Sequence, residues 1–244
     1  MPMRLDAALT ARGLSESRNR AQTVITDGHV TVNGLVCLKA SRQVTEDDEI
    51  CVTESLPYVG RGGYKLAFAL AEFKIRLQGL HCLDIGASTG GFTDCMLQNG
   101  AASVLAVDVG HDQLVQSLRD DSRVTVMEGT DVRSLPPDTD GLPADFASCD
   151  VSFISLTQII PCLPALLKDD AHAVLLVKPQ FEAGKQACNK HGVVRDEKIR
   201  QRVLRQITDF AAHSGFTPLG SCESPIKGGN GNTEYLLYLK KGSL

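Results

Sequence analysis

The stretch that decides the fold is Leu83-Asp84-Ile85-Gly86-Ala87-Ser88-Thr89-Gly90-Gly91-Phe92. An apolar run over 81–85 leads into it and a segment of helical character over 92–99 follows, so its glycines lie in a turn from a strand to a helix. Their spacing is neither the G-x-G-x-x-G of dinucleotide-binding folds nor the G-K-[ST] ending of a phosphate-binding loop. The turn therefore predicts an α/β fold whose ligand is held without a phosphate cradle.

Apolar strand candidates alternate with helical segments on the C-terminal side of this turn, and one helical segment precedes it. The strand candidates are residues 81–85, 103–107, 124–127, 146–149, 173–177, 217–222 and 235–239, and the helix candidates are 64–77, 92–99, 112–119, 155–168 and 196–213. Such alternation is typical of a parallel, doubly wound, Rossmann-like sheet. The last strand follows the short loop Gly228-Gly-Asn-Gly231, so we expect it to run antiparallel at the end of the sheet.

The first residues of the chain have another pattern. A short helix is expected to end at Gly13, and a second helix, capped by Ser15, to run to about residue 27. Two β-forming segments then flank Asn33-Gly34, a strong hairpin signal. The predicted organisation is a small α+β domain over residues 1–55, a Pro- and Gly-rich linker over 56–63, and the large domain over 64–244.

Composition excludes several classes of protein. The net charge of −4 does not indicate a nucleic-acid-binding protein, although residues 1–45 carry six basic and three acidic side chains. The 8 cysteines form no C-x-x-C pair, so we expect reduced thiols in a cytoplasmic protein and no zinc or other metal site. The longest uncharged run, 151–167, is shorter than the roughly 20 residues that a bilayer requires, so we expect no membrane span.

Acidic residues at strand ends indicate the ligand. Asp108 follows the second strand of the large domain, where a carboxylate can accept hydrogen bonds from both ribose hydroxyls of a nucleoside. Together with the glycine-rich turn, this acid favours S-adenosylmethionine (SAM). Asp131 follows the third strand and either contacts the adenine edge or is a surface turn residue. The predicted cofactor-binding residues are Asp84, Gly86, Ser88, Thr89, Gly90, Gly91, Phe92, Asp108, Val109 and Asp131.

Four further charged residues are candidates for catalysis. Asp150 and Lys178 end the fourth and fifth strands, and ligands of such sheets bind beyond the carboxyl ends of the strands. A lysine closing a buried apolar strand is unusual, although it can also be an edge residue that reaches solvent. Lys65 opens the helix after the linker and Glu234 begins the last strand, and either alone is more often a surface charge. Asp150-Val-Ser-Phe153 lacks the prolines of amine methyltransferases, which points away from a base nitrogen as acceptor.

These residues together resemble one family, the TlyA (hemolysin A) family of ribosomal RNA 2′-O-methyltransferases. The segments that carry the resemblance are Arg4-Leu-Asp, Gly13-Leu-Ser-Glu-Ser-Arg18, Val32-Asn-Gly34, Tyr58-Val-Gly-Arg61-Gly-Gly-Tyr-Lys65-Leu, residues 84–94, 150–156, 176–182, 192–196 and 224–234. They follow one another in order along nearly the whole chain. The stretch Gln186-Ala-Cys-Asn-Lys-His191 and the segment around Thr130-Asp131 depart from the pattern of the family.

The resemblance implies a fold, a tetrad and a partner. The family is similar to FtsJ-type 2′-O-methyltransferases, whose Lys-Asp-Lys-Glu tetrad falls on the four candidates Lys65, Asp150, Lys178 and Glu234. It also implies a SAM-dependent methyltransferase domain and an N-terminal RNA-binding domain that contacts ribosomal RNA or ribosomal subunits. The predicted RNA-binding residues are Arg4, Arg12, Arg18, Arg20 and Arg61.

The expected reaction is in-line transfer of the SAM methyl group to a ribose 2′-hydroxyl. Lys178 is expected to direct the hydroxyl, either as a neutral base or as a charged group that stabilises the developing alkoxide, and the sequence leaves both roles open. The alternatives are a ribosome-binding assembly factor that uses SAM weakly or not at all, and a small-molecule O-methyltransferase. A pore-forming toxin has the least support. The target nucleotide, the ribosomal subunit and the oligomeric state are not indicated by the sequence.

Overall fold

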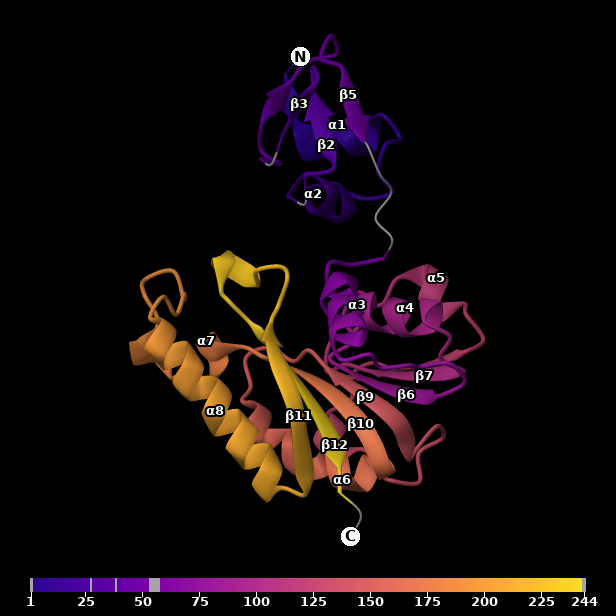
Figure 1. The fold of residues 1–244 in the computed structure, drawn as a ribbon. Helices are drawn as coiled ribbons and strands as arrows, with labels where there is room; N and C mark the ends of the chain where they lie inside the picture. The colour runs from indigo at the N-terminus through magenta and orange to yellow at the C-terminus, as the bar shows by residue number, and fades with distance from the viewer. Residues whose placement is uncertain (1, 27, 38, 53–57, 243–244) are drawn as a thin grey trace. The chain divides into compact units, whose positions relative to one another are not determined.

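The computed structural model describes residues 2–26, 28–37, 39–52 and 58–242. The chain divides into two compact units, Met1–Arg61 and Gly62–Leu244. Residues 56 and 57 of the predicted linker over 56–63 lie outside the described residues. Each unit has its own core of buried apolar residues, and Figure 1 shows the helices and strands of both.

The N-terminal unit packs two helices against short antiparallel strands. The elements are β1 (Met3–Arg4), α1 (Leu5–Ala11), α2 (Arg18–Thr26), β2 (Val30–Val32), β3 (Leu35–Val36), β4 (Gln43–Val44) and β5 (Ile50–Val52). β1 pairs with β4, and β2 lies between β3 and β5. The predicted Asn33-Gly34 hairpin is confirmed, because both residues have positive φ and join β2 to β3.

The cap predicted for the second helix was wrong. α2 begins at Arg18, and the Ser17 hydroxyl accepts a hydrogen bond from the backbone N–H of Arg20 at 3.2 Å. Ser15 instead donates its hydroxyl to the carbonyl of Ser17. Two serines shortly before a helical pattern are equally good caps on composition, and only the backbone path decides between them.

The large unit is a seven-stranded sheet in the order β11-β12-β10-β9-β6-β7-β8. The strands are β6 (His81–Ile85), β7 (Ser103–Val107), β8 (Val124–Met127), β9 (Ala144–Cys149), β10 (Leu167–Val177), β11 (Phe216–Glu223) and β12 (Tyr235–Lys241). The five strands from β10 to β8 pair in parallel, and β12 runs antiparallel to both of its neighbours. The predicted doubly wound sheet with an antiparallel last strand is confirmed.

Helices cover both faces of this sheet (Figure 1). The α-helices are α3 (Gly62–Glu72), α4 (Gly91–Gln98), α5 (Gln116–Arg119), α6 (Leu163–Leu166), α7 (Pro179–Glu182) and α8 (Glu197–His213), and the 3₁₀ turns are η1 (Val132–Ser134), η2 (Leu156–Gln158), η3 (Ile160–Cys162), η4 (Lys185–Ala187) and η5 (Gly229–Gly231). The main apolar core lies between the sheet and the helices α6 and α8, which cover one of its faces.

Two predicted helices were wrong. The 155–168 segment is broken into η2, η3 and α6, since Pro161 and Pro164 cannot donate the backbone hydrogen bonds of one continuous helix, and β10 already begins at Leu167. Only 116–119 of the predicted 112–119 helix is helical. The backbone N–H groups of residues 112, 113 and 114 instead donate to the Glu128 carboxylate, which holds that segment out of a helix.

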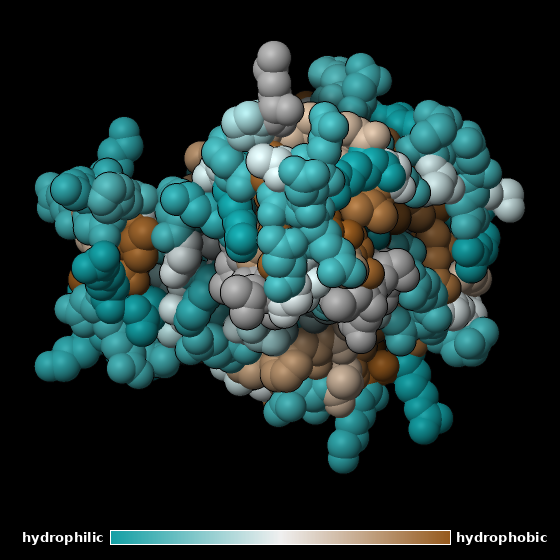
Figure 2. Space-filling model, turned by 90° about the horizontal axis from the view of Figure 1, so that it is seen from above, coloured by the Kyte–Doolittle hydropathy of each residue, from teal (hydrophilic) through white to brown (hydrophobic). Residues whose placement is uncertain are grey.

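The surface is largely hydrophilic on the face seen in Figure 2, with apolar residues showing between the polar ones. Within the described part of the chain, no helix combines the length and apolar character needed to cross a bilayer.

Candidate active site

The glycine-rich turn joins β6 to α4 through residues that need glycine. Gly86 has φ +81°, and a Cβ atom there would lie 2.8 Å from the backbone oxygen of Asp150. Gly90 has φ +99°, and its Cβ would lie 2.2 Å from a methyl of Leu118. Gly86 therefore lets the turn approach the end of β9, whereas Gly90 packs the turn onto the segment behind it. Gly86 faces a cavity and Gly90 does not line one.

Asp84 lies beneath the turn rather than in front of it. Its side chain is fully buried, and it accepts hydrogen bonds from the hydroxyls of Thr93 at 2.6 Å and Ser148 at 2.9 Å. Burial raises the pKa of Asp84 to about 6, although these two hydrogen bonds oppose the shift. Among the described residues, Asp84 does not line the cavities beside the turn, so it supports the turn from behind.

The first cavity, of about 490 Å³, lies along the ends of β6, β7 and β9. Asp108 lines it, and its two oxygens accept backbone N–H groups of Ser88 at 2.8 Å and Gly110 at 2.7 Å. Each carboxylate oxygen retains a further lone pair for a ligand hydroxyl. Val109 stands at the rim and is 70% exposed.

Asp131 lies at the other side of the same cavity and is held by Arg133. The two side chains form an ion pair at 2.5 Å, and the Asp131 carboxylate also accepts the backbone N–H of Arg133. These contacts lower the pKa of Asp131. Arg133 in turn donates to the side-chain oxygen of Gln158 at 3.0 Å. Arg133 therefore orients Asp131 at the cavity wall, a role that the sequence did not indicate.

The second cavity, of about 190 Å³, is lined by further residues of the glycine-rich turn. It is lined by Gly62, Gly86, Ala87, Ser88, Thr89, Gly91, Phe92, Asp150, Ser152 and Lys178. The predicted turn residues other than Asp84 and Gly90 thus face one or both of the two cavities. The end of β10 contributes Lys178 to this wall, so the turn and the predicted catalytic residues lie together.

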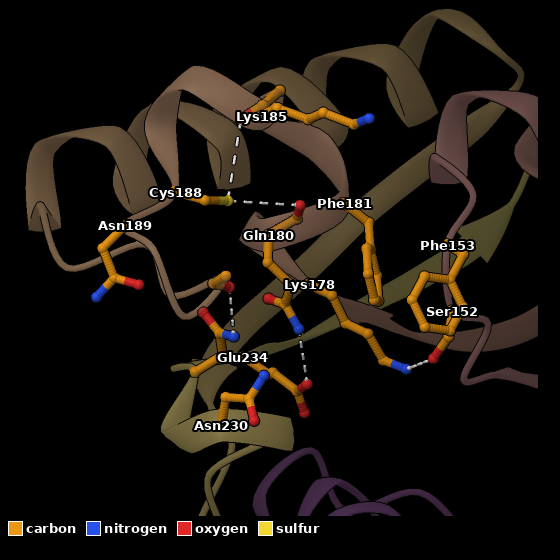
Figure 3. A pocket seen from close by; sticks show the side chains of 13 residues that line it. Ser152, Phe153, Lys178, Gln180, Phe181, Lys185, Cys188, Asn189, Asn230 and Glu234 are labelled. Carbon is orange, nitrogen blue, oxygen red and sulfur yellow. Dashed lines mark hydrogen bonds between the residues drawn. The ribbon is translucent and has the colours of Figure 1, made fainter.

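The third cavity, of about 750 Å³, is the largest of these three, and Figure 3 shows the side chains that line it. It is lined by Ser152, Phe153, Lys178, Gln180, Phe181, Gly184, Lys185, Cys188, Asn189, Gly192, Asn230, Asn232 and Glu234. Ser152 lines all three cavities, and Lys178 lines the second and the third. The end of β10 is therefore the boundary between the turn and the open cavity.

The four predicted catalytic residues form two ion pairs. Lys178 Nζ lies 2.6 Å from Asp150 Oδ1 and donates a hydrogen bond to Ser152 Oγ at 2.8 Å. Lys65 Nζ, on α3, lies 2.6 Å from Glu234 Oε2, just before β12. Both lysine side chains are only 10% exposed, so removal of either carboxylate would leave a largely buried side chain without its ion-pair partner.

Glu234 is fixed by its surroundings. The Gln180 amide donates to its Oε1 at 3.4 Å, and the Glu234 side chain is only 2% exposed. A Cβ atom on Gly228 would lie 1.9 Å from the same oxygen, so a side chain at this position would displace the Glu234 carboxylate. The sequence predicted a hairpin loop here and missed this closer role.

Phe153 is a further residue that sequence reasoning missed. It has φ +64° and is 91% exposed, and its ring lies 5.0 Å from that of Phe181. It lines the first and third cavities (Figure 3). A large apolar side chain held in the left-handed region and facing solvent is costly. Its position three residues after Asp150, in the loop that leaves a strand end, was the signal that could have found it.

The arginines predicted to bind RNA make contacts inside the N-terminal unit. Arg4 and Arg18 both approach the buried Asp6 carboxylate, at 2.8 and 3.4 Å. Arg12 donates to the carbonyls of Thr45 and Asp48.

The other two predicted arginines are Arg20 in α2 and Arg61, the last residue of this unit. Arg20 donates to the carbonyl of Tyr58, and Arg61 is half-buried at the end of the unit. The contact of Arg20 joins α2 to the last residues of this unit.

Comparison with known proteins agrees with this geometry. Residues 58–241 match the FtsJ-like methyltransferase family and residues 3–50 match the S4 domain. The 16S/23S rRNA (cytidine-2′-O)-methyltransferase TlyA of Mycobacterium tuberculosis is 44% identical over 97% of this chain and 89% of the relative. Hemolysin A of Brachyspira hyodysenteriae is 42% identical over 97% of this chain and 99% of the relative.

A solved structure is also similar. A provisionally named hemolysin from Streptococcus thermophilus shares 45% identity and a TM-score of 0.78, with 99% of this chain and 89% of that chain covered. The chain therefore belongs to the TlyA (hemolysin A) family of FtsJ-like methyltransferases and carries an S4 domain ahead of its methyltransferase domain.

Proposed function

We propose that this chain transfers the methyl group of SAM to a ribose 2′-hydroxyl of ribosomal RNA in the cytoplasm. The observation that carries the proposal is the place of Lys178. It lies in the wall shared by the turn cavity and the large open cavity, and it is paired with Asp150 at 2.6 Å. A methyl donor on one side and a hydroxyl on the other would meet at this lysine.

The residues around the turn fit the cofactor that the family uses. The free lone pairs of Asp108 suit the ribose hydroxyls, and Asp131 and Val109 lie where the adenine would be held. The narrow cavity lined by Gly86 and Thr89 suits the amino-acid end, which needs close approach to backbone groups rather than a phosphate cradle. When bound, SAM supplies a methyl group already activated on a sulfonium.

Lys178 would orient the attacking hydroxyl. Its ammonium is held by Asp150 and Ser152, so it is aimed without a change of conformation when negative charge develops on the attacking oxygen. Lys65 is held by Glu234 in the same manner, and Glu234 borders the open cavity. The proton released by the hydroxyl has a path to solvent through this cavity.

The open cavity suits RNA rather than a small molecule. Phe153 presents an almost fully exposed aromatic ring at its edge, and unstacked RNA bases bind to such rings. Two curated relatives of this chain are named rRNA (cytidine-2′-O)-methyltransferases. A ribosomal RNA nucleoside, and among nucleosides a cytidine, is therefore the proposed acceptor.

Transfer from labelled SAM to ribosomal subunits and to naked ribosomal RNA, followed by nucleoside analysis, tests the proposal. We expect a 2′-O-methylated nucleoside with the wild type, and no product with Lys178→Ala although that variant still binds SAM. Lys168→Ala, at the opposite end of β10, is the matched control and keeps activity. SAM binding without transfer to any RNA would favour the assembly-factor alternative, and normal turnover by Lys178→Ala would overturn the role of the lysine.

The N-terminal unit is proposed to supply part of the RNA affinity through Arg4, Arg12, Arg18, Arg20 and Arg61. Deletion of residues 1–55 is expected to weaken binding to ribosomal RNA by at least about tenfold, as when one or two phosphates are no longer bound, and to leave SAM binding unchanged. Titration of both ligands against the full and shortened chains measures the two effects. Equal RNA affinity of the two chains would refute this role.

A further inference from the structure

Three cations lie in a row along α8. Lys198, Arg202 and Arg205 are exposed and spaced i, i+4 and i+7, so they share one side of the helix. The buried residues Val203 and Ile207, with Ala211, lie on the opposite side and belong to the core beneath the sheet. Lys198, Arg202 and Arg205 are called the α8 stripe below.

The α8 stripe is not neutralised by the protein. Among the described residues, no ion pair involves Lys198, Arg202 or Arg205, and Asp209 at the far end of the stripe forms none with Arg205. Asp196, directly before α8, caps the helix, because its carboxylate accepts the backbone N–H of Lys198 at 2.8 Å.

This arrangement opposes the stability of the helix in two ways. Lys198 lies in the first turn of α8, where the helix dipole disfavours a cation. Lys198 and Arg202 are also like charges at i and i+4, which repel. Each effect is a few tenths of a kcal/mol. A solvated helix face normally alternates charges, so an uncompensated row indicates a negatively charged partner.

The positive charge continues toward the open cavity. Residues 185–205 carry seven basic side chains and two acidic ones, in a chain whose net charge is −4. Lys185 lines the cavity, and the segment from α7 to α8 runs from there to the stripe (Figure 1). The stripe spans about 10 Å of helix, and a nucleic-acid strand rises roughly 3.4 Å per phosphate, so it matches about three phosphates.

We propose that the α8 stripe binds the phosphate backbone of the RNA whose ribose enters the open cavity. This inference rests on the proposed function, because it names a second region of the chain that binds the same substrate. Phosphate contacts hold register without reading sequence, so the α8 stripe positions RNA and leaves the choice of nucleotide to the cavity. An anionic membrane surface is the competing partner, but the apolar side of α8 is already buried in the core.

The test compares two double charge reversals in the full chain. Arg202→Glu/Arg205→Glu removes the stripe, and Lys74→Glu/Arg76→Glu makes the same change in net charge at exposed cations beside α3. Thermal unfolding of each variant checks that it is folded. Binding to naked ribosomal RNA is measured between about 50 and 200 mM salt, the range over which phosphate binding dominates the change.

The stripe variant is expected to bind RNA at least about tenfold more weakly and to lower the slope of log affinity against log salt by about 2, one for each phosphate that its side chains no longer bind. The reduction of its methyl transfer appears in KM rather than kcat, and the control variant matches the wild type. Wild-type affinity and slope in the stripe variant, with methyl transfer by the wild type intact, would overturn the inference and leave the proposed function standing. Wild-type protein that neither transfers methyl nor binds RNA would overturn both.

A separate experiment tests whether the α8 stripe binds an anionic membrane surface. Wild type and stripe variant are mixed with vesicles of phosphatidylglycerol and phosphatidylcholine and separated by sedimentation. We expect no sedimentation of either protein. Vesicle binding by the wild type that is absent in the stripe variant, with RNA affinity unchanged, would reassign the surface to membranes.

Discussion

Among the described residues, each unit buries one aspartate completely, and the pKa values of these two carboxyl groups are shifted in opposite directions. In the N-terminal unit, Asp6 accepts hydrogen bonds from Arg4 at 2.8 and 3.0 Å, and its pKa is held well below the usual range. In the methyltransferase unit, Asp84 accepts hydrogen bonds from the hydroxyls of Thr93 and Ser148, and burial raises its pKa to about 6. The partner, rather than burial alone, decides whether a buried carboxylate remains charged.

The two carboxylates of the candidate active site, like Asp6, each have a basic partner. Asp150 and Glu234 each lie 2.6 Å from one lysine, and both lysines are largely buried. They differ from Asp6 in one respect: each lysine of the site has a single carboxylate, whereas Asp6 is approached by two arginines that are 42% and 56% exposed. Removal of one partner should therefore be severe in the site and moderate in the N-terminal unit.

The largest effect is expected from Glu234→Gln. The substitution leaves the Lys65 ammonium buried without a counter-charge, which costs about 3–5 kcal/mol in buried pairs. A rise of the activation barrier by this amount slows methyl transfer roughly a hundredfold to a few thousandfold. Initial rates at saturating SAM and RNA measure it.

Glu223→Gln is the matched control for that change. Glu223 pairs with Lys227 at 2.7 Å, but both side chains are 53% exposed, so the pair contributes at most about 1 kcal/mol. Its rate is expected to remain near that of the wild type. Equal rates for both variants would show that burial of the Lys65–Glu234 pair does not matter to transfer.

The next effect concerns Asp84 and pH. Its folded-state pKa of about 6 lies above the ordinary value of 3.8, so its contribution to stability is complete below about pH 4 and is lost as pH rises through 6. Asp84→Asn cannot ionise. We expect its stability to vary less with pH and to exceed that of the wild type by up to about 3 kcal/mol above pH 6, from a shift of roughly two units.

Urea unfolding followed by circular dichroism between pH 4 and 8 measures this difference. The exposed Asp209→Asn is the control and should follow the wild type at every pH. Parallel stability curves for wild type and Asp84→Asn would contradict a buried carboxyl that ionises near pH 6.

The sequence could predict which residues meet because parallel strands end at one edge. Asp108, Asp150 and Lys178 each follow a strand of the alternating pattern, and the structure places all three at the cavities. Asp84 comes one residue before the end of β6. Side chains alternate along a strand, so Asp84 points to the face covered by α4, away from the cavities.

The pairings could not be predicted in the same way. Lys65 and Glu234 are 169 residues apart, and nothing local says which lysine takes which carboxylate. The same limit applies to the 112–119 segment, where Glu128, from beyond β8, takes the backbone donors that a helix would use. Nothing in the local sequence distinguishes an N-terminal arginine that contacts RNA from one that makes contacts within the unit. Long-range hydrogen bonds, rather than propensity, decide these cases.

The smallest of these effects is expected from Asp6→Asn. It removes a charge-assisted acceptor from Arg4 and Arg18, but both arginines reach solvent, so the loss is discounted to about 2 kcal/mol of the stability of the N-terminal unit at neutral pH. A carboxyl with a lowered pKa contributes stability above its ordinary value, near pH 4, and the contribution fades as pH falls further. The difference between the two proteins should therefore shrink below pH 4.

Hydrogen exchange of the α1 and α2 amides measures this difference in stability, since these helices pack around Asp6, and the β6 amides serve as the internal control. Faster exchange in α1 and α2 at pH 7 with unchanged β6 is the expected result. Unchanged exchange in all three would mean that the arginines alone hold the helices together, and Asp6 would then differ from Asp84 in its pKa but not in its contribution to stability.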